Sequence, residues 1–178
     1  TLAFDPQSKA FVIIEYKRER NSSVIDQGCT YLSLMLQNQA DFILEYNETQ
    51  ARNLKRNDVD WSQTKVVFVS QGFTPNQREA VNFKDLSIEL WEVKRYENDS
   101  VFITPIRKSH ASASIKTVMQ NSPEFKEVTE KIKEYSEENL LKGKSDDVVE
   151  LYESYKNAIL NLNTEIEVKP QKWYVSFK

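Results

Sequence analysis

Two carboxylates and a lysine near the start of the chain have the types and spacing that could perform phosphate chemistry. Glu15 and Lys17 follow the apolar run Phe-Val-Ile-Ile, which is typical of a buried strand. Since side chains alternate along a strand, Glu15 and Lys17 project from the same face. Asp5 lies one predicted hairpin turn upstream, and we expect that turn to bring its carboxylate toward Glu15. Two acidic groups and an ammonium group would then gather at the edge of a buried core.

Metal-assisted hydrolysis of a phosphodiester needs this set of groups. Mg²⁺ takes oxygen ligands and keeps several waters, so two protein carboxylates and a substrate phosphate are enough to hold it. The metal polarises the scissile phosphate and lowers the pKa of a bound water, while a neighbouring lysine orients that water or stabilises charge on the phosphoryl oxygens. The spacing alone is weak evidence, because Glu-x-Lys on a strand is most often a solvated ion pair.

A helix predicted after the strand supplies two further polar groups. Ser22 or Ser23 is a suitable N-cap for a helix over about Val24–Gln37. Gln27 and Tyr31 are four residues apart and therefore share a face of this helix. They form either part of a substrate site or simply a partly buried helix surface. The acidic residues and the lysine lie on two strands joined by a turn, and Gln27 and Tyr31 lie on the helix that follows. All of these residues in this order are a more specific signal than any one of them alone.

Together these residues resemble the PD-(D/E)xK nuclease superfamily, in the branch similar to the RecB-type nucleases. That branch carries an Asp, then Asp or Glu-x-Lys, then Gln-x-x-x-Tyr, and the stretch FDPQSKAFVIIEYKRERNSSVIDQGCTYLSLML follows this order. The resemblance implies a restriction-endonuclease-like α/β fold, with a central mixed sheet flanked by helices, and hydrolysis of DNA with Mg²⁺ (or Mn²⁺). It further implies that Asp5 and Glu15 are metal ligands, Lys17 the catalytic lysine, Gln27 a further catalytic-site residue and Tyr31 its support.

Other segments are similar to an uncharacterised prokaryotic family that joins such a nuclease-like domain to a C-terminal domain of unknown function. The matching stretches include VDWSQTKVVFVS, FTPNQREAVNFKDLSIELWEVKRYE and the terminal KWYVSFK, so the resemblance covers essentially the whole chain. Members are sometimes labelled predicted transport proteins, a label that nothing in this sequence supports. The Pro that usually precedes the Asp is Phe4 here, and the acidic residue or histidine expected upstream of that Asp would lie before Thr1.

Alternating strand-like and helix-like segments position these residues. Strands are expected over the ranges Leu2–Asp5, Ala10–Lys17, Lys65–Ser70, Leu86–Tyr96 and Val101–Ile106. Ala40–Tyr46 either continues the first helix or forms an element of its own, and Thr74-Pro75 begins a short helix with a capping-box Gln. We expect a nuclease-like domain over 1–108, with its N-terminus missing.

A small α+β domain is expected over 123–178, after a linker over 109–122 rich in Ser, Ala and Thr. Its predicted elements are two amphipathic helices and two short strands, over Pro123–Tyr135, Asp146–Leu162, Glu165–Lys169 and Lys172–Phe177. Each helix carries an apolar stripe, and we expect these residues to be buried against each other or against a partner chain: Val128, Ile132, Leu151, Tyr155 and Ile159. The domain is expected to be truncated, because the family's second domain usually continues further.

Composition excludes several classes of protein. The chain has 178 residues, 39% of them hydrophobic, and a formal net charge of -3, which suits a folded domain with a small appendage rather than a disordered chain. One cysteine, Cys29, excludes an internal disulfide framework and fits a reducing, cytoplasmic location. No apolar stretch approaches the roughly 20 residues that span a bilayer, so no membrane partner is expected.

Basic residues near the predicted site are candidates for contacts with DNA phosphates. They are Arg18, Arg20, Arg52, Lys55 and Arg56. With a net charge of -3, ordinary solvated surface is the stronger interpretation for them. Three functions are therefore weighed: a nuclease, a catalytically silent nuclease-fold module that binds nucleic acid or protein, and an interaction protein that works through its C-terminal helices. The presence of all four chemical types (Asp, Glu, Lys and Gln) favours the nuclease; the expected partner is DNA, and a homodimer is allowed.

Overall fold

A computed structural model describes residues 1–18, 23–83, 85–109, 135–163 and 166–177. The chain divides into two compact units, over residues 1–132 and 133–178. The linker predicted over 109–122 lies outside the described residues from residue 110 onward, as does the helix predicted over 123–135 up to residue 134. Each unit is described by itself below.

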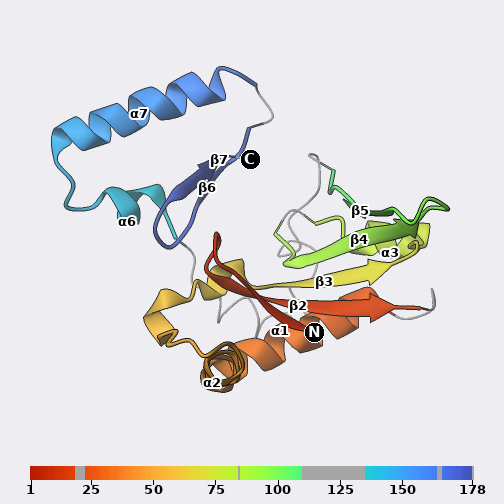
Figure 1. Ribbon diagram of the computed structural model, residues 1–178. Helices are drawn as coiled ribbons and strands as arrows, with labels where there is room; N and C mark the ends of the chain where they lie inside the picture. Colours follow the sequence, from red (N-terminus) through yellow and green to blue (C-terminus); the bar gives the residue numbers. More distant parts are fainter. Residues whose placement is uncertain (19–22, 84, 110–134, 164–165, 178) are drawn as a thin grey trace. The chain divides into compact units, whose positions relative to one another are not determined.

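The first unit is built around a mixed sheet of five strands in the order β1-β2-β3-β4-β5 (Figure 1). These strands run over Leu2–Asp5, Ala10–Lys17, Lys65–Ser70, Ile88–Arg95 and Val101–Pro105. The three central strands are parallel, whereas the two outer strands are antiparallel to their neighbours. The predicted mixed α/β architecture is confirmed, and the first three strands have the predicted bounds.

Three helices connect the strands of this sheet: α1 (Val24–Gln37), α2 (Gln39–Gln50) and α3 (Pro75–Ala80). The Ser23 hydroxyl caps α1 by accepting a hydrogen bond from the Asp26 N–H at 3.3 Å. The segment Ala40–Tyr46, predicted either to continue the first helix or to form an element of its own, is part of the separate helix α2. Two short 3₁₀ helices, η1 (Arg56–Asp58) and η2 (Trp61–Gln63), precede β3. As predicted, α3 begins with a capping box and a proline.

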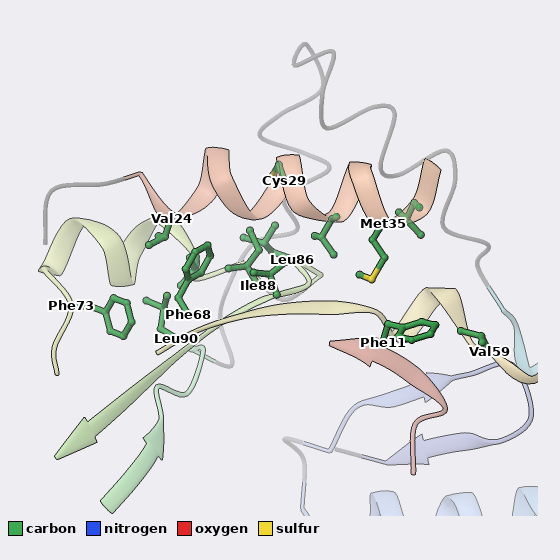
Figure 2. Packing of buried hydrophobic residues seen from close by; sticks show 14 residues of the cluster. Phe11, Val24, Cys29, Met35, Val59, Phe68, Phe73, Leu86, Ile88 and Leu90 are labelled. Atoms are coloured by element: carbon green, nitrogen blue, oxygen red, sulfur yellow. The ribbon is translucent and has the colours of Figure 1, made fainter. Parts of the chain in front are cut away.

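The main core lies between α1 and one face of the sheet (Figure 2). Alternate residues of the central strands point to this face, because cross-strand neighbours share a face. The cluster joins fourteen buried residues: Phe11, Val24, Cys29, Leu32, Met35, Leu36, Val59, Val66, Phe68, Phe73, Val81, Leu86, Ile88 and Leu90. We call the face of the sheet that packs against α1 the α1 face. Cys29 is buried here, as expected for a small core residue.

Gly28 sets how closely α1 approaches the sheet. A Cβ atom at this position would lie 2.3 Å from Ile88 Cδ1, 2.8 Å from Ile88 Cγ1 and 3.4 Å from Phe68 Cε2. Ile88 and Phe68 are fully buried, so neither can move aside without disturbing the core. The absence of a side chain at Gly28 therefore allows the helix to lie directly on β3 and β4.

The second unit contains α6 (Glu137–Leu141), α7 (Asp146–Leu160) and a two-stranded antiparallel sheet of β6 (Val168–Pro170) and β7 (Val175–Phe177). The predicted helix over 146–162 is confirmed as α7, and both strands are shorter than predicted. The carboxylate of Glu137 joins the two helices, since it accepts hydrogen bonds from Tyr152 Oη at 2.7 Å and Lys156 Nζ at 2.5 Å.

The apolar stripe of α7 is largely exposed in the described part of the second unit, so the predicted burial against a partner chain stays open. Leu151 and Tyr155 are 58% and 64% exposed, so the described part of the unit does not bury them, whereas Ile159 is half-buried. Their predicted neighbours Val128 and Ile132 lie outside the described residues. None of the helices in the described ranges combines the length and apolar composition needed to cross a membrane.

We expect Gly28→Ala to destabilise the first unit. Alanine gains about 1 kcal/mol of helix propensity, but overpacking a filled core typically costs about 1–3 kcal/mol, and two carbons of Ile88 would lie within 3 Å of the new atom. Urea unfolding of Gly28→Ala, Ile88→Val and the double variant measures the coupling. Since Ile88→Val removes the closest carbon, the double variant should be more stable than the sum of the two single effects predicts. Strict additivity would show that this contact does not limit the approach of α1.

Candidate functional site

The candidate site lies at the carboxyl end of β2, on the α1 face. Glu15 pairs in register with Phe68 of β3, and Lys17 pairs with Ser70. Phe68 is part of the core under α1, so its neighbour Glu15 and the residue two positions on, Lys17, face the helix as well. Both side chains therefore lie on the α1 face where the parallel strands β2 and β3 end.

Lys17 is held by the first turn of α1. Its Nζ donates a hydrogen bond to the Oε1 atom of Gln27 and lies 5.4 Å from the centre of the Phe68 ring. Gln27 precedes Gly28, where a Cβ atom would meet Ile88 and Phe68 of the sheet. The structure thus brings together Lys17 and Gln27, which are ten residues apart in the sequence.

Glu15 is a half-buried carboxylate beside this pair. Within the described part of the chain it makes no hydrogen bond and no ion pair. Its oxygens are therefore available to a cationic ligand that approaches the carboxyl end of β2.

Tyr31 lies one helical turn after Gln27 on α1. Its side chain is half-buried and packs against the edge of the core cluster. It thus shares the helix face predicted from the sequence, although it makes no hydrogen bond to Lys17 or Glu15 among the described residues.

The prediction that Asp5 and Glu15 converge is wrong. Asp5 pairs with Ala10 in the β1–β2 hairpin, so it lies at the turn, five positions along β2 from Glu15. Five positions correspond to about 17 Å at about 3.3 Å per residue. Because five is odd, Ala10 and its neighbour Asp5 also project from the sheet face opposite to Glu15. Asp5 therefore cannot share a metal ion with Glu15.

Asp5 instead stabilises the hairpin turn. Its carboxylate accepts hydrogen bonds from the Gln7 N–H at 2.9 Å and from the Ser8 hydroxyl at 2.7 Å. Partial burial alone would raise the pKa of Asp5, but these hydrogen bonds and the nearby charge of Lys65 outweigh it and leave the pKa below its ordinary value. This is the chemistry of a turn-capping carboxylate.

Three polar side chains that were not predicted, those of Ser70, Glu92 and Arg78, extend the site across the sheet. Lys17, Ser70 and Glu92 form one row over β2, β3 and β4 on the α1 face. Arg78 of α3 reaches this row and forms an ion pair with Glu92 at 2.5 Å. Ser70 ends the alternating run that also contains Phe68, so strand parity could have placed it in the row. The pairing of Glu92 with Arg78 has no signal in the sequence.

A group of three or more His, Cys, Asp or Glu side chains that could hold a metal ion is not present in the described ranges. Glu15 is one carboxylate, Asp5 lies on the other face, and Glu92 is neutralised by Arg78. Glu15 is thus the carboxylate at the candidate site that no described cation pairs with.

The predicted basic residues fall in two places. Arg18 is exposed and follows Lys17 directly, at the candidate site, whereas Arg20 lies outside the described residues. The other three, Arg52, Lys55 and Arg56, are exposed on the segment between α2 and β3. That segment enters the sheet at the amino end of β3, where the N–H of Asp60 donates to the Lys9 carbonyl at 2.8 Å. They therefore lie at the end of the sheet away from Glu15.

Comparisons with known proteins identify one relative of this chain. An uncharacterised protein of Haemophilus influenzae is 54% identical over all 178 residues of the chain. The chain spans 59% of the length of that protein. No protein-family model and no solved structure matches the chain.

We expect Asp5→Ala to lower stability and to leave metal binding unchanged. The substitution removes two hydrogen bonds to a charged acceptor, which we expect to cost about 1–3 kcal/mol in free energy of unfolding. Asp5→Asn keeps an acceptor oxygen and should lose less. Because the pKa of Asp5 is depressed by folding, its contribution is complete above the ordinary Asp pKa of about 3.9 and is lost as the pH falls through the folded value.

Urea unfolding at several pH values measures this effect. The difference between the wild type and Asp5→Ala should be constant above about pH 5 and shrink below about pH 4. A difference that stays constant down to pH 2 would show that the ionised carboxylate is not what stabilises the turn.

Proposed function

We propose that the chain is part of a cytoplasmic Mg²⁺- (or Mn²⁺-) dependent nuclease that hydrolyses phosphodiester bonds in DNA, on a restriction-endonuclease-like core. The observation that carries this proposal is the arrangement at the end of β2. A lysine ammonium held by Gln27 lies on the same sheet face as a half-buried carboxylate, Glu15, that has no partner among the described residues.

Each residue has a distinct part in the proposed reaction. Glu15 supplies an oxygen ligand for the metal, and the bound metal would polarise the scissile phosphate and acidify a water molecule. Lys17 stabilises negative charge that develops on the phosphoryl oxygens. Gln27 accepts a hydrogen bond from the Lys17 ammonium and the Phe68 ring packs beneath it, which restricts this flexible side chain before substrate arrives. Arg18 adds an exposed cation for a neighbouring phosphate.

The rival proposal is a catalytically silent module with the same fold that binds nucleic acid or a protein partner. The position of Asp5 favours it, since the site loses the second carboxylate that the resemblance implies. With a single unpaired carboxylate, metal affinity would depend strongly on the substrate phosphate. Metal binding with and without DNA therefore separates the two proposals.

The decisive variants are Lys17→Ala and Glu15→Gln, made in the full-length gene product because the chain spans 59% of its relative. We expect Lys17→Ala to lower the rate of Mg²⁺-dependent DNA cleavage by about 100-fold or more while metal binding persists, since a charge needed mainly in the transition state is lost. Glu15→Gln should lose both cleavage and metal binding. Asp5→Asn is the matched control: it also removes an acidic group, but from the other sheet face, and should cleave at the wild-type rate.

Cleavage of a labelled DNA duplex and calorimetric titration with Mg²⁺ or Mn²⁺ provide the two measurements. An undiminished rate for Lys17→Ala would exclude its proposed role. If the wild type binds no metal at millimolar concentration, with or without DNA, and cleaves nothing, the silent module is the correct function. Loss of activity in Asp5→Asn without loss of folding would overturn the assignment of Asp5 to the turn alone.

A further inference from the structure

Among the described residues, no strand pairs with the outer edge of the five-stranded sheet at β5. β5 is the last strand in the sheet order, and all five of its residues are exposed. The residues on either side of β5, Ser100 and Ile106, direct their backbone groups toward β4 and its extension. The Ile106 N–H donates to the Leu90 carbonyl at 2.8 Å, and the Ser100 carbonyl accepts from the Tyr96 N–H at 2.9 Å, so even-numbered residues of this segment face β4. Since backbone groups alternate in direction along a strand, Ile103 directs its N–H and C=O away from β4.

Apart from Pro105 at its end, this edge lacks the features that usually prevent pairing with another chain. It carries no charged residue between Val101 and Pro105, and Val101, Phe102 and Ile103 are 57%, 60% and 53% exposed. Protected edges carry lysines, prolines, inward-pointing charges or bulges. The opposite edge strand, β1, differs because all four of its residues are half-buried. An open, apolar and uncharged edge is suited to the addition of a further strand.

Two opposite charges flank β5 at equal distances in sequence from Ile103. Asp99 precedes Ile103 by four residues, and Arg107 follows it by four. Arg107 is exposed and forms no ion pair with the described residues, while Asp99 is 80% exposed and pairs only with its neighbour Arg95. An antiparallel strand of the same sequence would place its basic end against the acidic end of this one.

We propose that two copies of this chain associate through antiparallel pairing of their β5 strands, with Ile103 of each copy opposite Ile103 of the other. In this register the two Ile103 residues exchange both outward backbone hydrogen bonds, and each Val101 N–H meets the Pro105 carbonyl of the other copy. Asp99, in the turn before β5, then lies at the end of the interface near Arg107 of the other copy, so the same pair of opposite charges meets twice, as two-fold symmetry requires. A parallel arrangement would instead place like charges together.

Charge exchange tests the partner and the register. Arg107→Glu sets two acidic residues opposite each other at both ends of the interface, and Asp99→Lys sets two basic residues there. We expect each variant alone to dimerise with a dissociation constant about tenfold or more above that of the wild type. An equimolar mixture should restore association, because every contact in the mixed dimer joins opposite charges.

Sedimentation equilibrium of the 178-residue chain over micromolar concentrations measures these constants. Thermal unfolding followed by circular dichroism confirms that each variant is folded, which matters for Asp99 because its φ is 59° and lysine is less favoured there. If the wild type stays monomeric at a protein concentration of about 100 μM, which is 100 times a dissociation constant of about 1 μM, the proposal is overturned. Dimerisation of the single variants that equals the wild type, or a mixture that associates no better than they do, also overturns it.

Ile103→Pro probes the backbone directly. Proline removes the outward N–H but none of the bonds to β4, and edge strands accept it where the N–H faces solvent. The matched control Ile103→Thr keeps the N–H and reduces only the apolar surface. We expect the proline variant to be folded and monomeric under conditions in which the threonine variant still dimerises. A proline variant that dimerises like the wild type would show that β5 is not the interface.

Discussion

The close contact between α1 and the sheet at Gly28 is the constraint on which the rest of the first unit depends. No side chain separates the helix from Ile88 and Phe68, so the helix lies directly on β3 and β4. Gln27, the preceding residue, is thereby carried to the carboxyl end of β2, where Lys17 donates to its amide oxygen. A larger residue at position 28 would lift the first turn of α1 and lengthen that contact. The packing of the core at Gly28 therefore also determines the geometry of the candidate site.

The hairpin between β1 and β2 applies a second constraint, through the parity of its register. The pairing of Asp5 with Ala10 fixes which face every residue of β1 occupies relative to β2. A shift of one residue would move Asp5 to the α1 face, although it would still lie at the turn, far from Glu15. The turn that sets this register has Lys9 at a φ of 52°, and the Asp5 carboxylate holds it through Gln7 and Ser8. The residue that looked like a metal ligand is thus one that keeps the sheet in register.

These two constraints explain what could be predicted from the sequence. Strand β2, helix α1 and the capping box of α3 follow from local periodicity and capping chemistry, which act over a few residues. The shared face of Glu15 and Lys17 follows from strand alternation alone. The place of Asp5 depends on the register across a turn, and the row of Lys17, Ser70 and Glu92 depends on the register between β2, β3 and β4, which local patterns do not encode. Leu151 and Tyr155 are exposed in the described part of the second unit, and their predicted burial against a partner chain stays a prediction, because an apolar stripe predicts a covered face without saying which part of a protein covers it.

The sheet order also relates the candidate site to the edge at β5. Antiparallel pairing through β5 has its two-fold axis perpendicular to the sheet, so the α1 faces of both copies would lie on the same side. From β2 of one copy to β2 of the other there would be seven strand spacings, or about 34 Å across a flat sheet at about 4.8 Å each. That separation is close to one turn of duplex DNA, about 34–36 Å. At about 20–25° per strand, however, the natural twist of the sheet would turn the two sites by roughly 140–175° relative to each other over those seven spacings. Although the spacing is close to one duplex turn, the two sites would then face different directions, so assembly through β5 does not by itself bring both sites onto one straight duplex.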